Sequence, residues 1–193
     1  LTIADGIARV NATTDTKSNG NTILPMPGCL YSASTTYTVT ADDTVRIELD
    51  PLRRMRDLYF ELTVTEGDPE RIASVKGVLS GIAGTYTLAT ESPGGESMTT
   101  APAFTRDGNR VTADARLLGT AGEAQILVLT LHFTDGKAQT IENDLTEMLR
   151  TFNTDMQTPL KISGTLLMPT AANPGTATIT DWQVQEVVDI TIK

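Results

Sequence analysis

The sequence predicts an all-β protein built as a two-sheet β-sandwich with one short crossover helix. Apolar and polar residues alternate with period two in several stretches, which places the apolar side chains on one face of a strand. Clusters of Gly, Pro, Asp and Asn separate these stretches and suit tight turns. Aromatic residues make up only 5% of the chain against 39% for all hydrophobic residues, so the core must consist mainly of aliphatic side chains.

The first 30 residues differ from the remainder of the chain. Residues 11–21 are polar and have no apolar period, and a Pro-Met-Pro-Gly stretch follows at residues 25–28. We interpret residues 1–30 as an N-terminal arm or as the remnant of a preceding domain. The sandwich domain is then expected in residues 31–193.

Alternation identifies the strands of the sandwich in order along the chain. The row of Leu127, Leu129, Leu131 and Phe133 forms the clearest inner face. Near the C-terminal end, Gly164 interrupts an apolar row and indicates a bulge or a close approach of another segment. The other predicted strands cover residues 45–49, 58–65, 111–117 and 162–168, and residues 182–192 are apolar at even positions except at Glu186.

Turn signals connect these strands. Residues 106–109 read Arg-Asp-Gly-Asn between two strand candidates and predict a hairpin. Asp135 and Gly136, directly after the apolar row that ends at Phe133, predict another. Further turn signals occur at residues 66–69, 93–95 and 173–175.

One stretch has helical spacing. Leu145, Met148, Leu149 and Phe152 fall at i, i+3, i+4 and i+7, which places them on one face of a helix. Asn143 precedes them and is a residue type that caps helix N-termini. We expect this helix to cross an open end of the sandwich.

Charge and cysteine content narrow the functional classes. The net charge is −9, which argues against nucleic-acid binding and gives no attraction to anionic lipid surfaces. Cys29 is the only cysteine, so an internal disulfide and a cysteine-based zinc site are excluded. No stretch is apolar enough to span a bilayer, and no secretory signal opens the chain, which is therefore cytosolic, processed or truncated.

No catalytic constellation emerges from the sequence. The only histidine, His132, lies on the face opposite the apolar row of its strand, and one outward histidine supplies no Ser-His-Asp or Cys-His arrangement. Cys29 is preceded by neither an apolar run nor the small residues of an acylation site, so we interpret it as a loop thiol. We therefore predict that the protein is not an enzyme.

Metal and cofactor sites are not predicted either. Asp42 and Asp43 form one acidic pair, and Glu66, Asp68 and Glu70 form a second group that superficially has the spacing of a calcium loop. No complete calcium motif is present, and we interpret the second group as a solvated turn. The glycines at positions 77, 81 and 84 lack the strand-to-helix context of a phosphate-binding loop.

An arginine cluster precedes the strand that begins near residue 58. Arg53, Arg54 and Arg56 follow a Pro and lead directly into the apolar alternation. One interpretation is a contact with an anion or a partner. We favour the other, a solvated edge whose charge prevents strand-to-strand aggregation.

A family resemblance rests on this region. The stretch VRIELDPLRRMR at residues 45–56 leads into LYFELTV at residues 58–64 and IASVKGVLSG at residues 72–81. This succession resembles the fimbrial accessory and anchor proteins of Bacteroidales, in particular the FimB/Mfa2-like group. The likeness covers roughly residues 40–193 and includes residues 141–149 and 182–192.

The resemblance implies a transthyretin-like β-sandwich and a location at the cell surface or outer membrane. Members of the family are usually exported lipoproteins with two such domains, so the signal and the lipid-bearing cysteine would lie before Leu1. Their expected partners are fimbrial subunits that associate by strand addition, in which a sheet edge supplies unpaired N–H and C=O groups. In such bacteria, Asp43-Thr44-Val45 fits an O-glycosylation signal of Asp-Thr followed by an aliphatic residue.

The leading hypothesis is therefore an accessory or anchor subunit of fimbriae. The alternative is a surface module that binds a glycan or a protein through exposed aromatic residues. A hydrolase is the weakest hypothesis, because it needs paired carboxylates near His132. The aromatic platform of the alternative would draw on Tyr31, Tyr37, Tyr59, Tyr86 or Trp182.

Overall fold

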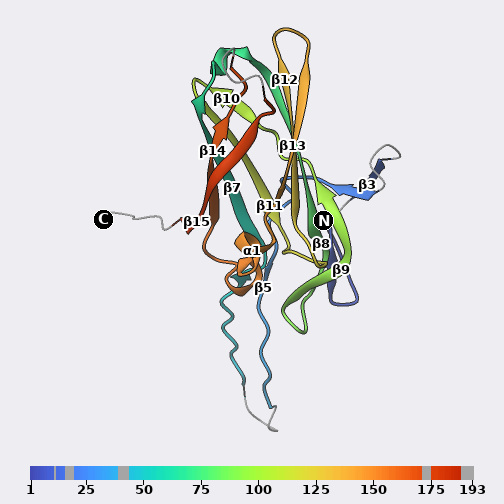
Figure 1. The fold of residues 1–193 in the computed structure, drawn as a ribbon. Helices are drawn as coiled ribbons and strands as arrows, with labels where there is room; N and C mark the ends of the chain where they lie inside the picture. The colour runs from blue at the N-terminus through green and yellow to red at the C-terminus, as the bar shows by residue number, and fades with distance from the viewer. Residues whose placement is uncertain (11, 16–19, 39–43, 171–174, 188–193) are drawn as a thin grey trace.

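The chain folds as a β-sandwich in the computed structural model, which describes residues 1–10, 12–15, 20–38, 44–170 and 175–187 (Figure 1). The predicted all-β sandwich is confirmed. One sheet has eight strands: β1 (Thr2–Ala4), β2 (Ile7–Arg9), β3 (Ala12–Asp15), β4 (Gly20–Ile23), β8 (Ile72–Thr87), β9 (Ser92–Thr100), β12 (Ile126–Phe133) and β13 (Ala138–Asp144). The other has five: β7 (Arg56–Glu66), β10 (Thr105–Asp107), β11 (Arg110–Leu117), β14 (Leu160–Leu167) and β15 (Thr178–Glu186).

The core lies between the two sheets. In β7, the inner positions Leu58, Phe60 and Leu62 are buried, and the alternating positions face outward. The inner row of β12 is buried in the same way, as its period-two pattern predicts. Strand β7 pairs antiparallel with β11 and parallel with β14, so it occupies the centre of the five-stranded sheet.

Residues 1–30 are paired with the sandwich within the described part of the chain. Strand β2 pairs with β8, and β4 pairs with β9, so this segment extends the eight-stranded sheet. Ala8, Val10 and Ile23 are buried in the common core. The polar stretch 11–21 gave no strand signal, but its described part contains strands of the β3–β4 hairpin. The division into domains at residue 30 stays a prediction.

The strand predicted at residues 45–49 is absent. Residues 33–38 and 44–50 instead run as two extended legs away from one end of the sandwich, and we call these legs the projection (Figure 1). At its base, the short strands β5 (Tyr31–Ser32) and β6 (Leu52–Arg53) pair with each other. The apolar alternation of this stretch is therefore exposed to solvent instead of facing the core.

The predicted helix is much shorter than its apolar spacing suggests. Helix α1 covers only Thr146–Leu149, and a 3-10 turn, η2, follows at Phe152–Thr154. The predicted cap is wrong, because Asn143 lies in β13 opposite Leu127. Helix α1 lies at the end of the sandwich from which the projection leaves (Figure 1). The apolar residues Leu145, Leu149 and Phe152 are buried there.

Both predicted hairpins are present. Gly108 joins β10 to β11, and Gly136 joins β12 to β13, each with a positive φ that favours glycine. Gly164 also behaves as predicted, because the register of β14 against β15 shifts beside it. A Cβ atom at this position would lie 2.9 Å from Ile179 and 3.1 Å from the Trp182 ring, so the bulge allows a close approach.

Candidate functional site

In the arginine cluster, Arg54 and Arg56 are buried and Arg53 is half-buried, so its interpretation as a solvated edge is wrong. The Arg56 side chain has no solvent exposure and lies beneath the loop that contains α1. Its Nε donates to the carbonyl of Thr158 at 2.5 Å, and its Nη1 donates to the carbonyl of Phe152 at 3.1 Å. Its Nη2 donates to a Glu186 carboxylate oxygen at 3.1 Å. Arg56 thus ties β7 to the loop before β14 and to the end of β15.

Arg54 clamps the base of the projection. Its backbone N–H donates to the carbonyl of Leu30 at 2.8 Å, and its Nε donates to the Ser32 hydroxyl at 2.8 Å. The guanidinium also pairs with the carboxylate of Glu91, which precedes β9. Because Leu30 is itself buried, both ends of the projection are held against the sandwich. The neighbouring Arg53 pairs with Asp57 at 2.6 Å.

In the two large sheets, five described strands pair with one neighbour each, and the longest of them are β13 and β15. Strand β15 pairs only with β14, and β13 pairs only with β12. The β15 edge carries Trp182, which is half-buried against the core, and Val184, which is 45% exposed although it lies opposite the buried Ile162. An apolar residue exposed on the inner face of an edge strand marks a place where the sandwich can take a further strand.

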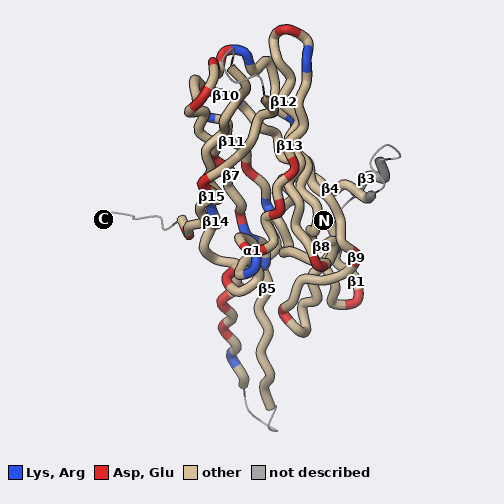
Figure 2. The backbone as a smooth tube through the Cα atoms, viewed as in Figure 1, with Lys and Arg blue, Asp and Glu red and all other residues tan. Residues whose placement is uncertain are grey.

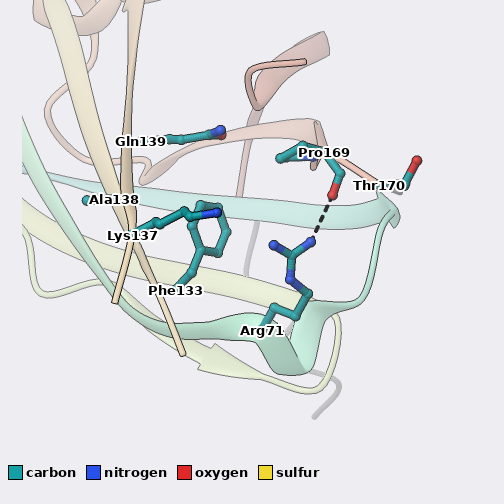
Figure 3. A pocket seen from close by; sticks show the side chains of 7 residues that line it. All are labelled: Arg71, Phe133, Lys137, Ala138, Gln139, Pro169 and Thr170. Carbon is teal, nitrogen blue, oxygen red and sulfur yellow. Dashed lines mark hydrogen bonds between the residues drawn. The ribbon is translucent and has the colours of Figure 1, made fainter. Parts of the chain in front are cut away.

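A pocket of about 420 Å³ opens between β13 and the segment that follows β14 (Figure 3). Arg71, from the 3-10 turn η1 (Pro69–Arg71), points into this gap and donates to the carbonyl of Pro169 at 3.0 Å. Its guanidinium lies 5.4 Å from the centre of the Phe133 ring. Lys137 lies at the rim and pairs with Asp135 at 3.7 Å. The arrangement gives this acidic protein a local cationic surface that suits a carboxylate or another anion.

Ion pairs cover the outer face of the five-stranded sheet. Glu61 on β7 accepts hydrogen bonds from Arg110 on β11 and from Lys161 on β14, with the Lys161 nitrogen at 3.1 Å. Burial alone would raise the pKa of Glu61, but the two cations outweigh it and hold this pKa below its usual value. Figure 2 shows that the positions of basic and acidic residues are interspersed along the described backbone.

The residues considered for chemistry lie apart. His132 is on the outer face of β12 as predicted, and Cys29 is an exposed loop thiol. In the turn after β7, Asp68 caps η1 and Glu70 pairs with Arg106 at 2.9 Å, so this turn is structural. Within the described residues, no group of three or more His, Cys, Asp or Glu side chains is arranged to hold a metal ion.

The glycines of β8 serve packing. A Cβ atom at Gly77 would lie 2.2 Å from the Phe104 ring, and one at Gly84 would lie 2.2 Å from the Met98 sulfur. Gly81 has a φ of +76° where the pairing of β8 with β9 shifts register. All three lie within one strand, as expected for residues that do not form a phosphate loop.

The five aromatic residues of the alternative hypothesis do not form one platform. Tyr86 is buried, and burial raises the pKa of its hydroxyl. Trp182 is packed against the core. Tyr37 is exposed on the projection, and Tyr31 is exposed at its base. Tyr59 is exposed on the outer face of β7. The exposed Tyr31 and Tyr37 therefore belong to the region of the projection, and the exposed Tyr59 belongs to the outer face of the five-stranded sheet.

Two further expectations concern modification and membranes. Asp42 and Asp43 lie outside the described residues, and with them part of the glycosylation signal at residues 43–45. Among the described residues, the structure contains no helix with the length and apolar character needed to span a membrane. Neither finding identifies a site by itself.

Known structures share the fold. A candidate adhesin from Bacteroides ovatus has a TM-score of 0.54 at 19% identity, and the match covers 67% of this chain and 52% of that one. The fimbrial anchor protein Mfa2 from Porphyromonas gingivalis has a TM-score of 0.51 at 10% identity, covering 97% of this chain and 69% of that one. The chain thus spans about half the length of the first structure. No curated protein sequence matches it.

The family follows from the sequence as a whole. The family model of the fimbrillin-A associated anchor proteins Mfa1 and Mfa2 matches residues 3–188. This range takes in residues 3–30 as well as the arginine cluster on which the resemblance rests. The resemblance is confirmed: the chain belongs to the family of fimbrillin-A associated anchor proteins Mfa1 and Mfa2.

Proposed function

We propose that this protein is an accessory or anchor subunit of fimbriae at the cell surface. The observation that carries the proposal is the family match over residues 3–188, and the shared fold with a fimbrial anchor protein supports it. An outer-membrane location through a lipid carried by a more N-terminal segment, and a transthyretin-like sandwich, are parts of the same proposal. So is a structural and non-enzymatic role, since the family is one of fimbrial anchors.

We further propose that assembly proceeds by strand addition. The open edges of β13 and β15 support this, because each carries backbone N–H and C=O groups that no described strand pairs. The exposed Val184 adds an apolar contact for an incoming strand at the β15 edge. Main-chain hydrogen bonds then supply affinity, and the alternating side chains supply selectivity for the partner.

Gene deletion tests the proposed role directly. Fimbriae on the deletion strain are expected to be missing, shortened or shed into the medium, as seen by electron microscopy and by immunoblotting of cell and medium fractions for the major subunit. Complementation with the intact gene is expected to restore them. Unchanged fimbriae in the deletion strain would contradict the proposal. Metabolic labelling with a fatty-acid analogue tests the lipid anchor separately, since an unlabelled protein would contradict only that part.

A further inference from the structure

The projection carries a strand pattern without a sheet. Val45, Ile47 and Leu49 are 40–50% exposed, and they alternate with Arg46 and Glu48, whose side chains pair with each other at 3.1 Å. Within the described chain, residues 45–50 make no backbone hydrogen bond. An extended segment with one apolar row and unpaired backbone groups has the chemistry of a strand that lacks a neighbour.

The base of the projection directs it away from its own sheets. Strands β5 and β6 pair with each other, and Arg54 binds Leu30, Ser32 and Glu91 around them. Both legs leave the sandwich at the end that carries α1 and point outward from it (Figure 1). With its base held in this way, the projection pairs with no strand edge of the described sandwich and is free to meet one on another molecule.

The β15 edge lacks the neighbouring strand that the projection could supply. Val184 lies on the inner face of this strand opposite Ile162, yet it is 45% exposed because no strand beyond β15 covers it. Trp182, two residues earlier, is half-buried on the same apolar side and fills the space over Gly164. Gln183 and Gln185 alternate with them and are uncharged. The row of Trp182 and Val184 ends at Glu186, opposite the buried Leu160, where the carboxylate is bound to Arg56. An added strand would therefore cover Trp182 and Val184 and meet no charge at Gln183 and Gln185.

We propose that residues 45–50 of one molecule add as a sixth strand to the five-stranded sheet of a second copy, along β15. With Ile47 opposite Val184, one of Val45 and Leu49 meets Trp182 in either strand direction, because Ile47 is the centre of its row. The other meets Glu186, whose carboxylate is bound to Arg56. Arg46 and Glu48 then lie on the outer side, beside Gln183 and Gln185, where no like charges meet. This inference deepens the proposed function, since it names the donor and the acceptor of strand addition.

The contact is heterologous, because the donor and the acceptor are different surfaces of the same chain. After pairing, the dimer keeps one free projection, on the acceptor molecule, and one free β15 edge, on the donor molecule. Self-association is therefore expected to continue beyond a dimer into a linear series, or to close into a ring when the rotation between copies allows it.

Sedimentation velocity of the purified full chain tests the proposal, over roughly a hundredfold range of concentration. The weight-average mass is expected to rise with concentration. Ile47→Glu on the projection and Val184→Glu on β15 are each expected to weaken association at least about tenfold, because a carboxylate would be buried in the contact. Val78→Glu is the matched control: this valine is 37% exposed on β8, outside the proposed contact, and the variant is expected to associate like the wild type.

Disulfide trapping locates the contact. In a Cys29→Ser background, a mixture of Ile47→Cys and Val184→Cys molecules is expected to form mixed disulfide dimers in excess over either homodimer, because directly opposed strand residues lie within disulfide reach. A wild type that remains monomeric over the whole range, or association that survives both Glu variants, would overturn the proposal. Loss of fimbriae in the deletion strain alongside a monomeric chain would then leave the fimbrial role intact and assign strand addition to a different subunit.

Discussion

Replacing Arg56 by Met removes the guanidinium and keeps most of the side-chain volume. The carbonyls of Thr158 and Phe152 then lose their donor, whereas the carbonyl of Thr151 keeps a hydrogen bond from the N–H of Thr154. A buried polar group without its partner costs about 1–3 kcal/mol, so two such carbonyls give a loss of about 3 kcal/mol in the free energy of unfolding. The carboxylate of Glu186 is 57% exposed and returns to water at little cost.

Urea unfolding followed by circular dichroism measures this loss. With a denaturant slope of about 2 kcal/mol per M, the midpoint is expected to fall by about 1.5 M. Glu186→Gln is expected to shift it by less than about 0.5 M, because the exposed carboxylate contributes little. Arg46→Met is the matched control, since the Arg46 side chain is 86% exposed. A midpoint for Arg56→Met equal to that of the control would refute the reasoning.

Two further substitutions test packing and charge. Gly77→Ala places a methyl group 2.2 Å from the Phe104 ring and is expected to lower the free energy of unfolding, measured by heat or urea, by about 1–3 kcal/mol. Gly28→Ala is the control and is expected to leave this free energy unchanged, because a methyl group there meets open space. An equal melting temperature for both variants would contradict this account of β8. Because the pKa of Glu61 is lowered in the folded state, its stabilisation is complete above the usual carboxyl pKa and is lost as pH falls through the lowered value. The stability of Glu61→Gln should therefore fall less on acidification than that of the wild type, and parallel pH profiles of their urea midpoints would show that Glu61 does not contribute.

The sequence identifies the strands that lie in the middle of the sheets. The rows at residues 58–64, 111–117 and 127–133 alternate strictly, because one face of each strand meets the core and the other meets water. The two hairpins are equally predictable, since Gly108 and Gly136 occupy positions with positive φ. In these places local pattern and tertiary environment specify the same structure.

Prediction fails where distant residues decide the outcome. Residues 45–49 have the same alternation as a core strand, but the described fold offers them no neighbour. Arg56 is buried because carbonyls about a hundred residues further along the chain, at Thr158 and Phe152, face it across the end of the sandwich. Nothing in the sequence near Arg56 indicates those acceptors. The exposed edge at Val184 is likewise a property of the sheet order.

The parallel pairing of β7 with β14 has a consequence for how the chain acquires its fold. Leu58 lies opposite Leu160 in this parallel pair. The central strand of the five-stranded sheet therefore pairs with residues roughly a hundred positions later in the chain. Contacts between residues so far apart in sequence slow folding, because a long loop must close first. While the polypeptide emerges from the ribosome, β7 has only β11 as an early partner. The five-stranded sheet therefore cannot be completed before residues 160–167 have been synthesised. A late completion of this sheet prolongs the time in which the chain is extended enough to pass through a narrow pore.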